Sequence, residues 1–199
     1  MQNNDTSYDL CLASASPRRR ALLEQIGLSC LLYPVDLDET VMPGESAPSY
    51  VLRLAEQKAA AGQKRSGTHL PVLGSDTSVV LKGKILGKPK NTRHAVDMLM
   101  ALSGQTHQVM TGVAVCQHDR VQSIISVTDV SFRSLTEAEC FAYCDTGEPF
   151  DKAGGYGIQG LAAVFVRSVS GSYSNVVGLP LFETADLLKQ FGIRLLERS

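Results

Sequence analysis

Three consecutive arginines follow a helix start signal near the beginning of the chain and could bind phosphate. An apolar run over residues 8–13 ends at serines, and Ser16-Pro17 suits the N-cap and first turn of a helix. Arg18 to Arg20 would then surround a helix N-terminus, where unpaired backbone N–H groups attract anions. Guanidinium groups can bind phosphate through paired hydrogen bonds. The alternative is a capped surface helix with solvated arginines, and this segment alone does not decide between the two.

Isolated carboxylates and lysines supply other groups that phosphate chemistry needs. Asp76 lies in a run of small residues and could bind a divalent metal or take a proton from water; a turn-capping aspartate is the alternative. Lys88 precedes a proline that fixes the backbone for a phosphate contact, unless it is an ordinary hairpin lysine. Glu39 ends an acidic run, and Lys152 precedes a glycine-rich loop, although either segment could simply be solvated. Together these residues fit metal-assisted hydrolysis of a phosphate ester or anhydride.

The glycine-rich segment 155–160 matches the GxGxxG pattern of dinucleotide-binding sites but lacks their context. That pattern must follow a strand and open a helix. Here it follows Asp151-Lys152 and leads into a strand-like stretch at 164–166. The chain also has no GxxxxGK[ST] run. We therefore expect neither a Rossmann cofactor site nor a P-loop.

Composition excludes several classes of protein. The 199 residues carry a formal net charge of -1 and 6% aromatic residues, which argues against a nucleic-acid partner. No segment has the length and apolarity of a membrane span. The five cysteines form no CxxC pair, so we expect reduced thiols in a cytoplasmic protein and no zinc site.

Alternating strands and helices followed by a long hairpin predict an α/β fold with a mixed, twisted central sheet flanked by helices. We expect one domain over residues 1–199. The predicted strands are 8–13, 29–35, 71–81 with an interruption at 74–77, 106–117, 121–132 and 161–169. The predicted helices are 17–26, 47–61, 92–102, 136–147 and a final one opened by Pro180.

Seven blocks, in the same order, resemble the Maf family of nucleoside triphosphate pyrophosphatases. They lie at residues 12–19, 53–58, 74–77, 87–89, 102–107, 151–160 and 177–181, and so span nearly the whole chain. The resemblance implies a Maf/ITPase-like fold with two lobes around a cleft, and a homodimer. It also implies hydrolysis between the α- and β-phosphates with Mg²⁺ or Mn²⁺, giving a nucleoside monophosphate and pyrophosphate.

The resemblance assigns roles to particular residues. Asp76 and Lys88 would be catalytic, with Asp76 as the proton acceptor, and Glu39 and Asp76 would hold the metal. The substrate-binding positions implied are Ser14, Arg18, Arg19, Lys58, Thr77, Lys152 and Gln159.

Three of these positions bear on the substrate. Arg18, Thr77 and Gln159 go with family members that hydrolyse dTTP and UTP, whereas a subgroup acting on 7-methyl-GTP has Trp, Gln and Glu there. Ser75, where many pyrimidine-type members have Ala, is a small departure. We expect an enzyme that removes dTTP, UTP or modified pyrimidine nucleotides in a house-cleaning role. The alternatives are a 7-methyl-GTP pyrophosphatase, or a nucleotide-binding regulator of septum formation that needs no turnover.

Overall fold

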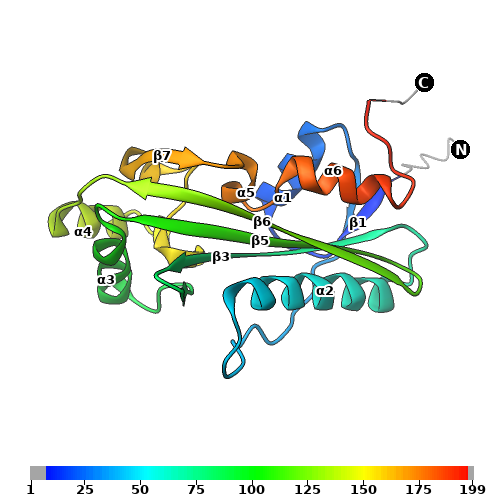
Figure 1. Cartoon of the computed structure of the whole chain (residues 1–199), viewed down its shortest axis with the longest axis horizontal. Helices are drawn as coiled ribbons and strands as arrows, with labels where there is room; N and C mark the ends of the chain where they lie inside the picture. Colours follow the sequence, from blue (N-terminus) through cyan, green and yellow to red (C-terminus); the bar gives the residue numbers. More distant parts are fainter. Residues whose placement is uncertain (1–7, 197–199) are drawn as a thin grey trace, which may run out of the picture.

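A seven-stranded mixed sheet runs the length of the molecule in the computed structural model, which describes residues 8–196 (Figure 1). The strand order is β2-β1-β3-β5-β6-β7, and β4 pairs with the end of β3. β1 is parallel to β2 and β3, and the other pairs are antiparallel. The strands are β1 (Leu10–Leu12), β2 (Cys30–Leu32), β3 (Val72–Leu81), β4 (Lys84–Leu86), β5 (Thr106–Gln117), β6 (Arg120–Phe132) and β7 (Val166–Ser170).

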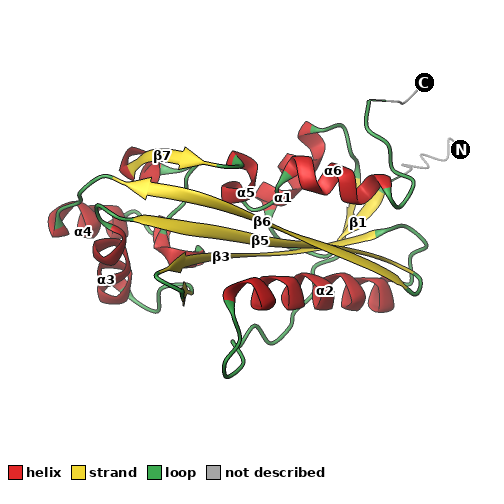
Figure 2. Cartoon of the chain, viewed as in Figure 1, coloured by secondary structure: helices red, strands yellow, loops and turns green. Residues whose placement is uncertain are grey.

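Helices cover both faces of the sheet and one of its ends (Figure 2). The long helix α2 lies on one face, and α1, α5 and α6 lie on the other. Helices α3 and α4 pack together at the open end of the β5–β6 hairpin, away from its turn. The α-helices are α1 (Pro17–Gln25), α2 (Ala47–Ser66), α3 (Thr92–Leu102), α4 (Glu137–Asp145), α5 (Tyr173–Val177) and α6 (Leu181–Lys189). Three 3₁₀ turns, η1 (Glu148–Asp151), η2 (Ala153–Gly155) and η3 (Leu161–Phe165), lie between α4 and β7.

Helix α2 packs with its backbone directly against the sheet. A Cβ atom on Gly74 of β3 would lie 2.5 Å from the amide nitrogen of Ala59, and one on Gly112 of β5 would lie 2.6 Å from the carbonyl carbon of Val51. Both distances are far below van der Waals contact, so the approach of α2 requires glycine at these two positions. This close approach brings the side chain of Lys58 down to β3.

A stretch of β3 has an open edge, and it divides the molecule into two lobes. β3 pairs with β1 at Val72 and Leu73 and with β4 only from Val79 onward. Among the described residues, 74–78 have no strand partner on this side, although β5 pairs with all of them on the other. The predicted α/β architecture with two lobes around a cleft is therefore confirmed.

Several predicted elements need correction. The interruption of the strand at 74–77 is wrong: these small residues are paired with β5 throughout, and Gly74 serves the contact with α2. Asp76 consequently lies within a strand, not in a break between two strand segments. The predicted strand 161–169 begins as the 3₁₀ turn η3, where two alanines favour helical backbone. Helix α2 continues to Ser66, and α5 was not predicted.

Side-chain caps open two of the predicted helices. Thr136 and Glu139 form the capping box that opens α4, and Asn91 caps α3. All five cysteines are unpaired thiols, as predicted. In the part of the chain that the structure describes, no helix is both long enough and apolar enough to cross a membrane.

Candidate active site

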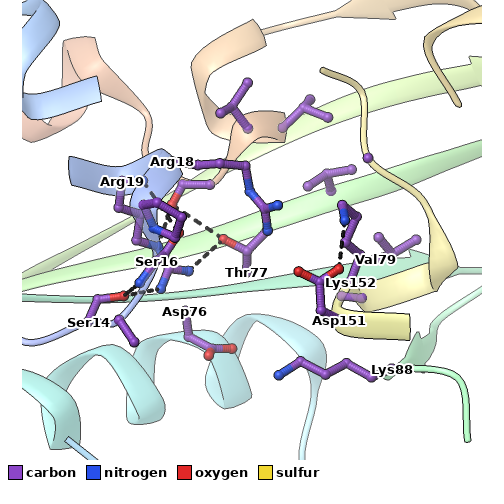
Figure 3. Close-up of a pocket in the computed structure, with 18 of the residues that line it drawn as sticks. Ser14, Ser16, Arg18, Arg19, Asp76, Thr77, Val79, Lys88, Asp151 and Lys152 are labelled. Carbon is purple, nitrogen blue, oxygen red and sulfur yellow. Dashed lines mark hydrogen bonds and ion pairs between the residues drawn. The ribbon is translucent and has the colours of Figure 1, made fainter. Parts of the chain in front are cut away.

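A cleft of about 970 Å³ opens along the free edge of β3 (Figure 3). Its walls come from the β1–α1 junction, α2, the loop after β4, and the 3₁₀ segment that follows α4. Every predicted site residue lines it: Ser14, Arg18, Arg19, Glu39, Lys58, Asp76, Thr77, Lys88, Lys152 and Gln159. The fold thus gathers into one cavity residues that the sequence separates by as much as 145 positions.

The centre of the cleft is a buried lysine shared by two carboxylates. Lys58 Nζ, on α2, lies 2.7 Å from Asp76 Oδ1 and 2.6 Å from Glu39 Oε1. Lys58 and Asp76 are both 8% exposed, whereas the Glu39 side chain is 45% exposed. The pair is therefore shielded from water on the sheet side and open to the cleft through Glu39.

The two carboxylates have different electrostatic environments. Burial raises the pKa of Asp76, and the charges of Lys58 and Arg19 oppose this only in part. Burial alone would also raise the pKa of Glu39. The positive charges of Lys58, Lys88 and Arg19 together bring this pKa below its usual value. Within residues 8–196 no donor bonds to Asp76 Oδ2, so this oxygen can accept a proton or a ligand.

Two residues of α2, Tyr50 and Arg53, hold the loop that carries Glu39. The Tyr50 hydroxyl donates to the backbone carbonyl of Glu39 at 2.8 Å. Arg53 forms a two-pronged ion pair with Glu45, with N–O distances of 2.6 and 2.8 Å, and also donates to the carbonyl of Thr40. No role for Tyr50 or Glu45 could be predicted from the sequence, because their contacts involve a loop that has no regular secondary structure.

Arg19 holds three segments of the site together. Its Nε donates to the Gly178 carbonyl at 2.9 Å, and its two terminal nitrogens donate to Ser14 Oγ at 3.2 Å and Thr77 Oγ1 at 3.1 Å (Figure 3). The predicted N-cap is present, because Ser16 Oγ accepts from the Arg19 amide. This guanidinium is not a solvated surface group.

The other two arginines differ from Arg19. Arg18 lines the cleft and is close enough to Asp151 to lower the pKa of that carboxyl, which is held down mainly by Lys152. Arg20 is exposed and pairs with Glu24 one helical turn away, as the alternative of a solvated surface arginine predicted. One run of arginines therefore divides into a cleft-lining residue, a structural residue and a surface residue.

Successive side chains of β3 bond to groups on opposite faces of the sheet. Asp76 points to Lys58 on α2, whereas Ser75 and Thr77 donate to the carbonyl of Gly178, which follows α5. Thr77 also shares a hydrogen bond with Thr111 of β5 at 3.0 Å. The Gly178 carbonyl was missed in the sequence, although block 177–181 marked its neighbourhood.

The remaining lysines lie on loops of the second lobe. Lys88 is exposed at the cleft after β4, on a loop joined to η2 by the hydrogen bond from the Gly154 amide to the Gly87 carbonyl. Lys152 Nζ bonds to Asp151 Oδ1 at 2.6 Å and to a backbone carbonyl at 2.8 Å. Gln159 is exposed at the cleft wall.

The two carboxylates of the cleft suit a divalent cation that takes its other ligands from water or substrate phosphates. Among residues 8–196 no group of three His, Cys, Asp or Glu side chains could hold a metal. Asp76 and Glu39 nevertheless converge on one cationic group, the Lys58 ammonium. Mg²⁺ commonly uses one or two carboxylates together with water and substrate phosphates, so these two residues fit such a site.

Comparison with known proteins places the chain in a family. The chain is 56% identical to a dTTP/UTP pyrophosphatase of Saccharophagus degradans, over 95% of this chain and 91% of that protein. Identity is 52% to proteins of the same name from Bordetella avium (94% and 96% covered) and Escherichia coli O157:H7 (92% and 92%). The fold resembles a HAM1 protein from Coxiella burnetii, with a TM-score of 0.53, 16% identity, and 92% and 100% of the chains covered. The model of Maf-like proteins matches residues 9–191, and the chain belongs to the Maf family.

Proposed function

We propose that this protein hydrolyses dTTP and UTP, and modified pyrimidine triphosphates, to the monophosphate and pyrophosphate. The relatives named dTTP/UTP pyrophosphatase support this substrate class. The observation that carries the reaction type is the buried Lys58 shared by Asp76 and Glu39 at the open edge of β3. It combines a proton acceptor, a metal-compatible carboxylate pair and positive charge in one cavity.

Asp76 is the residue best placed to activate water. Its raised pKa and its open Oδ2 suit an acceptor for the proton that water loses when it attacks a phosphorus atom. Negative charge then grows on the leaving pyrophosphate. Lys58 from the sheet side and Lys88 from the opposite lobe are the cations that balance this charge.

A divalent cation, Mg²⁺ or Mn²⁺, belongs to this proposal. Asp76 and Glu39 would hold it, and it would supply further charge for the phosphate oxygens. Lys58 contacts both carboxylates, so it keeps them together and limits their mutual repulsion before the cation binds.

Base recognition falls to the part of the cleft wall that carries Gln159. A neutral amide both donates and accepts, which matches the edge of thymine or uracil, whereas a carboxylate would favour the cationic 7-methylguanine. Arg18 and Thr77 line the same cleft.

The test is pyrophosphate release with Mn²⁺ from dTTP, UTP, dCTP, GTP and 7-methyl-GTP. Wild type, Asp76→Asn and a control, Asp97→Asn, are compared. Asp97 is an exposed residue of α3 in a surface ion pair, so its variant should behave as wild type. We expect turnover of dTTP and UTP that is lost in Asp76→Asn. Turnover chiefly of 7-methyl-GTP would refute the substrate assignment, and nucleotide binding without turnover would favour the regulator.

The homodimer, the cytoplasmic location and the house-cleaning role remain predictions that accompany this proposal.

A further inference from the structure

Glu148 occupies the cleft wall beside the predicted base-recognition residue without belonging to the catalytic cluster. It is the first residue of η1 and lines the cleft. Its Oε1 accepts from the Tyr143 hydroxyl at 2.8 Å, and its Oε2 accepts from the backbone amide of Leu161 at 2.9 Å. The carboxylate therefore joins α4 to the far end of the loop 149–160.

The glycine-rich segment is shaped to receive this carboxylate. A Cβ on Gly160 would lie 2.5 Å from Glu148 Oε2, and a Cβ on Gly157 would lie 3.5 Å from Oε1. Gly160 must lack a side chain for the carboxylate to reach the Leu161 amide. This contact gives a structural reason for part of the GxGxxG pattern, which does not join a strand to a helix here.

Of the residues assigned to the substrate, Gln159 lies next to this carboxylate contact. Gln159 directly precedes Gly160, and its backbone is therefore held next to the point where the carboxylate binds. Lys152 Nζ also donates to the backbone carbonyl of Glu148 at 2.8 Å, a contact that does not involve the carboxylate.

The Tyr143 hydroxyl, which donates to Glu148 Oε1, stays protonated. Tyr143 is 4% exposed, and burial together with the nearby carboxylate raises the pKa of its hydroxyl. The hydroxyl thus remains a donor, and Glu148 acts as an acceptor on both of its oxygens. With both oxygens engaged by protein donors, the carboxylate is placed to hold the loop and not to react.

We propose that Glu148 is a positioning residue that sets nucleobase discrimination by holding Gln159 at the cleft wall. This inference rests on the proposed function and deepens it. Glu148 acts through the loop, so its loss should weaken substrate binding and selectivity more than the chemical step.

Glu148→Gln and Glu148→Ala separate positioning from direct chemistry. Glutamine keeps an acceptor for the Leu161 amide, and its NH₂ group can donate to the Tyr143 oxygen, so the loop stays anchored. Alanine removes both contacts. We expect Glu148→Ala to raise KM for dTTP roughly 10- to 100-fold with a smaller change in kcat, by analogy with the loss of an outer-shell group that orients a metal ligand.

Selectivity and loop order supply the second readout. In Glu148→Ala the preference for dTTP over 7-methyl-GTP should fall, and the Leu161 amide should exchange with deuterium faster than in wild type. Glu148→Gln should stay near wild type in both. Tyr143→Phe removes one of the two contacts and should be intermediate, which keeps the test decisive if the alanine variant does not fold.

Two results would overturn the inference. If Glu148→Gln lost kcat as severely as Glu148→Ala, the charge itself would be needed and Glu148 would be catalytic. Unchanged selectivity in a folded Glu148→Ala protein would show that the loop does not depend on Glu148.

If wild type hydrolyses neither dTTP nor UTP, the proposed function fails by itself. The inference is then decided by the ratio of dTTP to 7-methyl-GTP affinity and by the Leu161 exchange rate.

Discussion

Gly74→Ala should separate the docking of α2 from the chemistry of the cluster. The added Cβ would lie 2.5 Å from the Ala59 amide nitrogen. Contacts of this kind settle near about 3.5 Å, so the helix must retreat by about 1 Å. Ala59 follows Lys58 in the chain, and the retreat therefore draws the ammonium away from Asp76, to which it is now bonded at 2.7 Å.

The expected cost has two parts. Overpacking at a contact between backbones destabilises a protein by about 1–3 kcal/mol, which urea unfolding measures. A misplacement of about 1 Å at a reacting group can cost roughly 100-fold in rate, which kcat for pyrophosphate release from dTTP measures. Ser78→Ala is the control, because Ser78 is buried on the same strand and its variant adds no atoms. A Gly74→Ala protein with wild-type stability and wild-type kcat would refute the claim that this contact sets the position of Lys58.

Three further changes test charge and specificity. Burial lowers the pKa of His107, bonded to Tyr156 at 2.7 Å, to about 4. The unfolded chain therefore binds this proton first, and roughly 3 kcal/mol of stability should be lost as pH falls from about 6.5 toward 4. Urea unfolding at several pH values should show a smaller loss in His107→Gln. Lys58→Met should raise the pKa of Asp76 further and move the acid limb of the kcat/KM profile to higher pH. Gln159→Glu should lower kcat/KM for dTTP relative to 7-methyl-GTP in the nucleotide panel.

Features set by neighbouring residues were predictable from the sequence. Ser16 caps α1 and Thr136 caps α4 through contacts three residues away, and the hairpin of β5 and β6 follows from alternation around a short turn. These signals depend on bonds within one turn or one strand pair. They gave the fold class, but they could not show that residues 74–78 form the open edge of a strand, because that depends on where β1 ends and β4 begins.

The site's residue types were predictable, whereas their partners were not. Lys58 and Asp76 are separated by 18 positions and Arg19 and Gly178 by 159, and no periodicity connects such pairs. The resemblance supplied the order of the blocks without the contacts between them. Glu148 was not predicted for the same reason, since the amide that it accepts from lies 13 residues further along the chain, after an irregular loop.

Arg19 lines the cleft as predicted, but its contacts differ from those that its place in the sequence suggested. The sequence favoured phosphate because guanidinium groups stand at a helix start. In the folded chain three of its five N–H groups donate to protein acceptors on Gly178, Ser14 and Thr77. Two N–H groups, one on each terminal nitrogen, remain for a ligand. The main role of Arg19 is therefore to hold α1, β3 and the segment after α5 together. Arg18, whose guanidinium faces the cleft without such a set of acceptors in the described chain, is the better candidate for direct contact with the nucleotide.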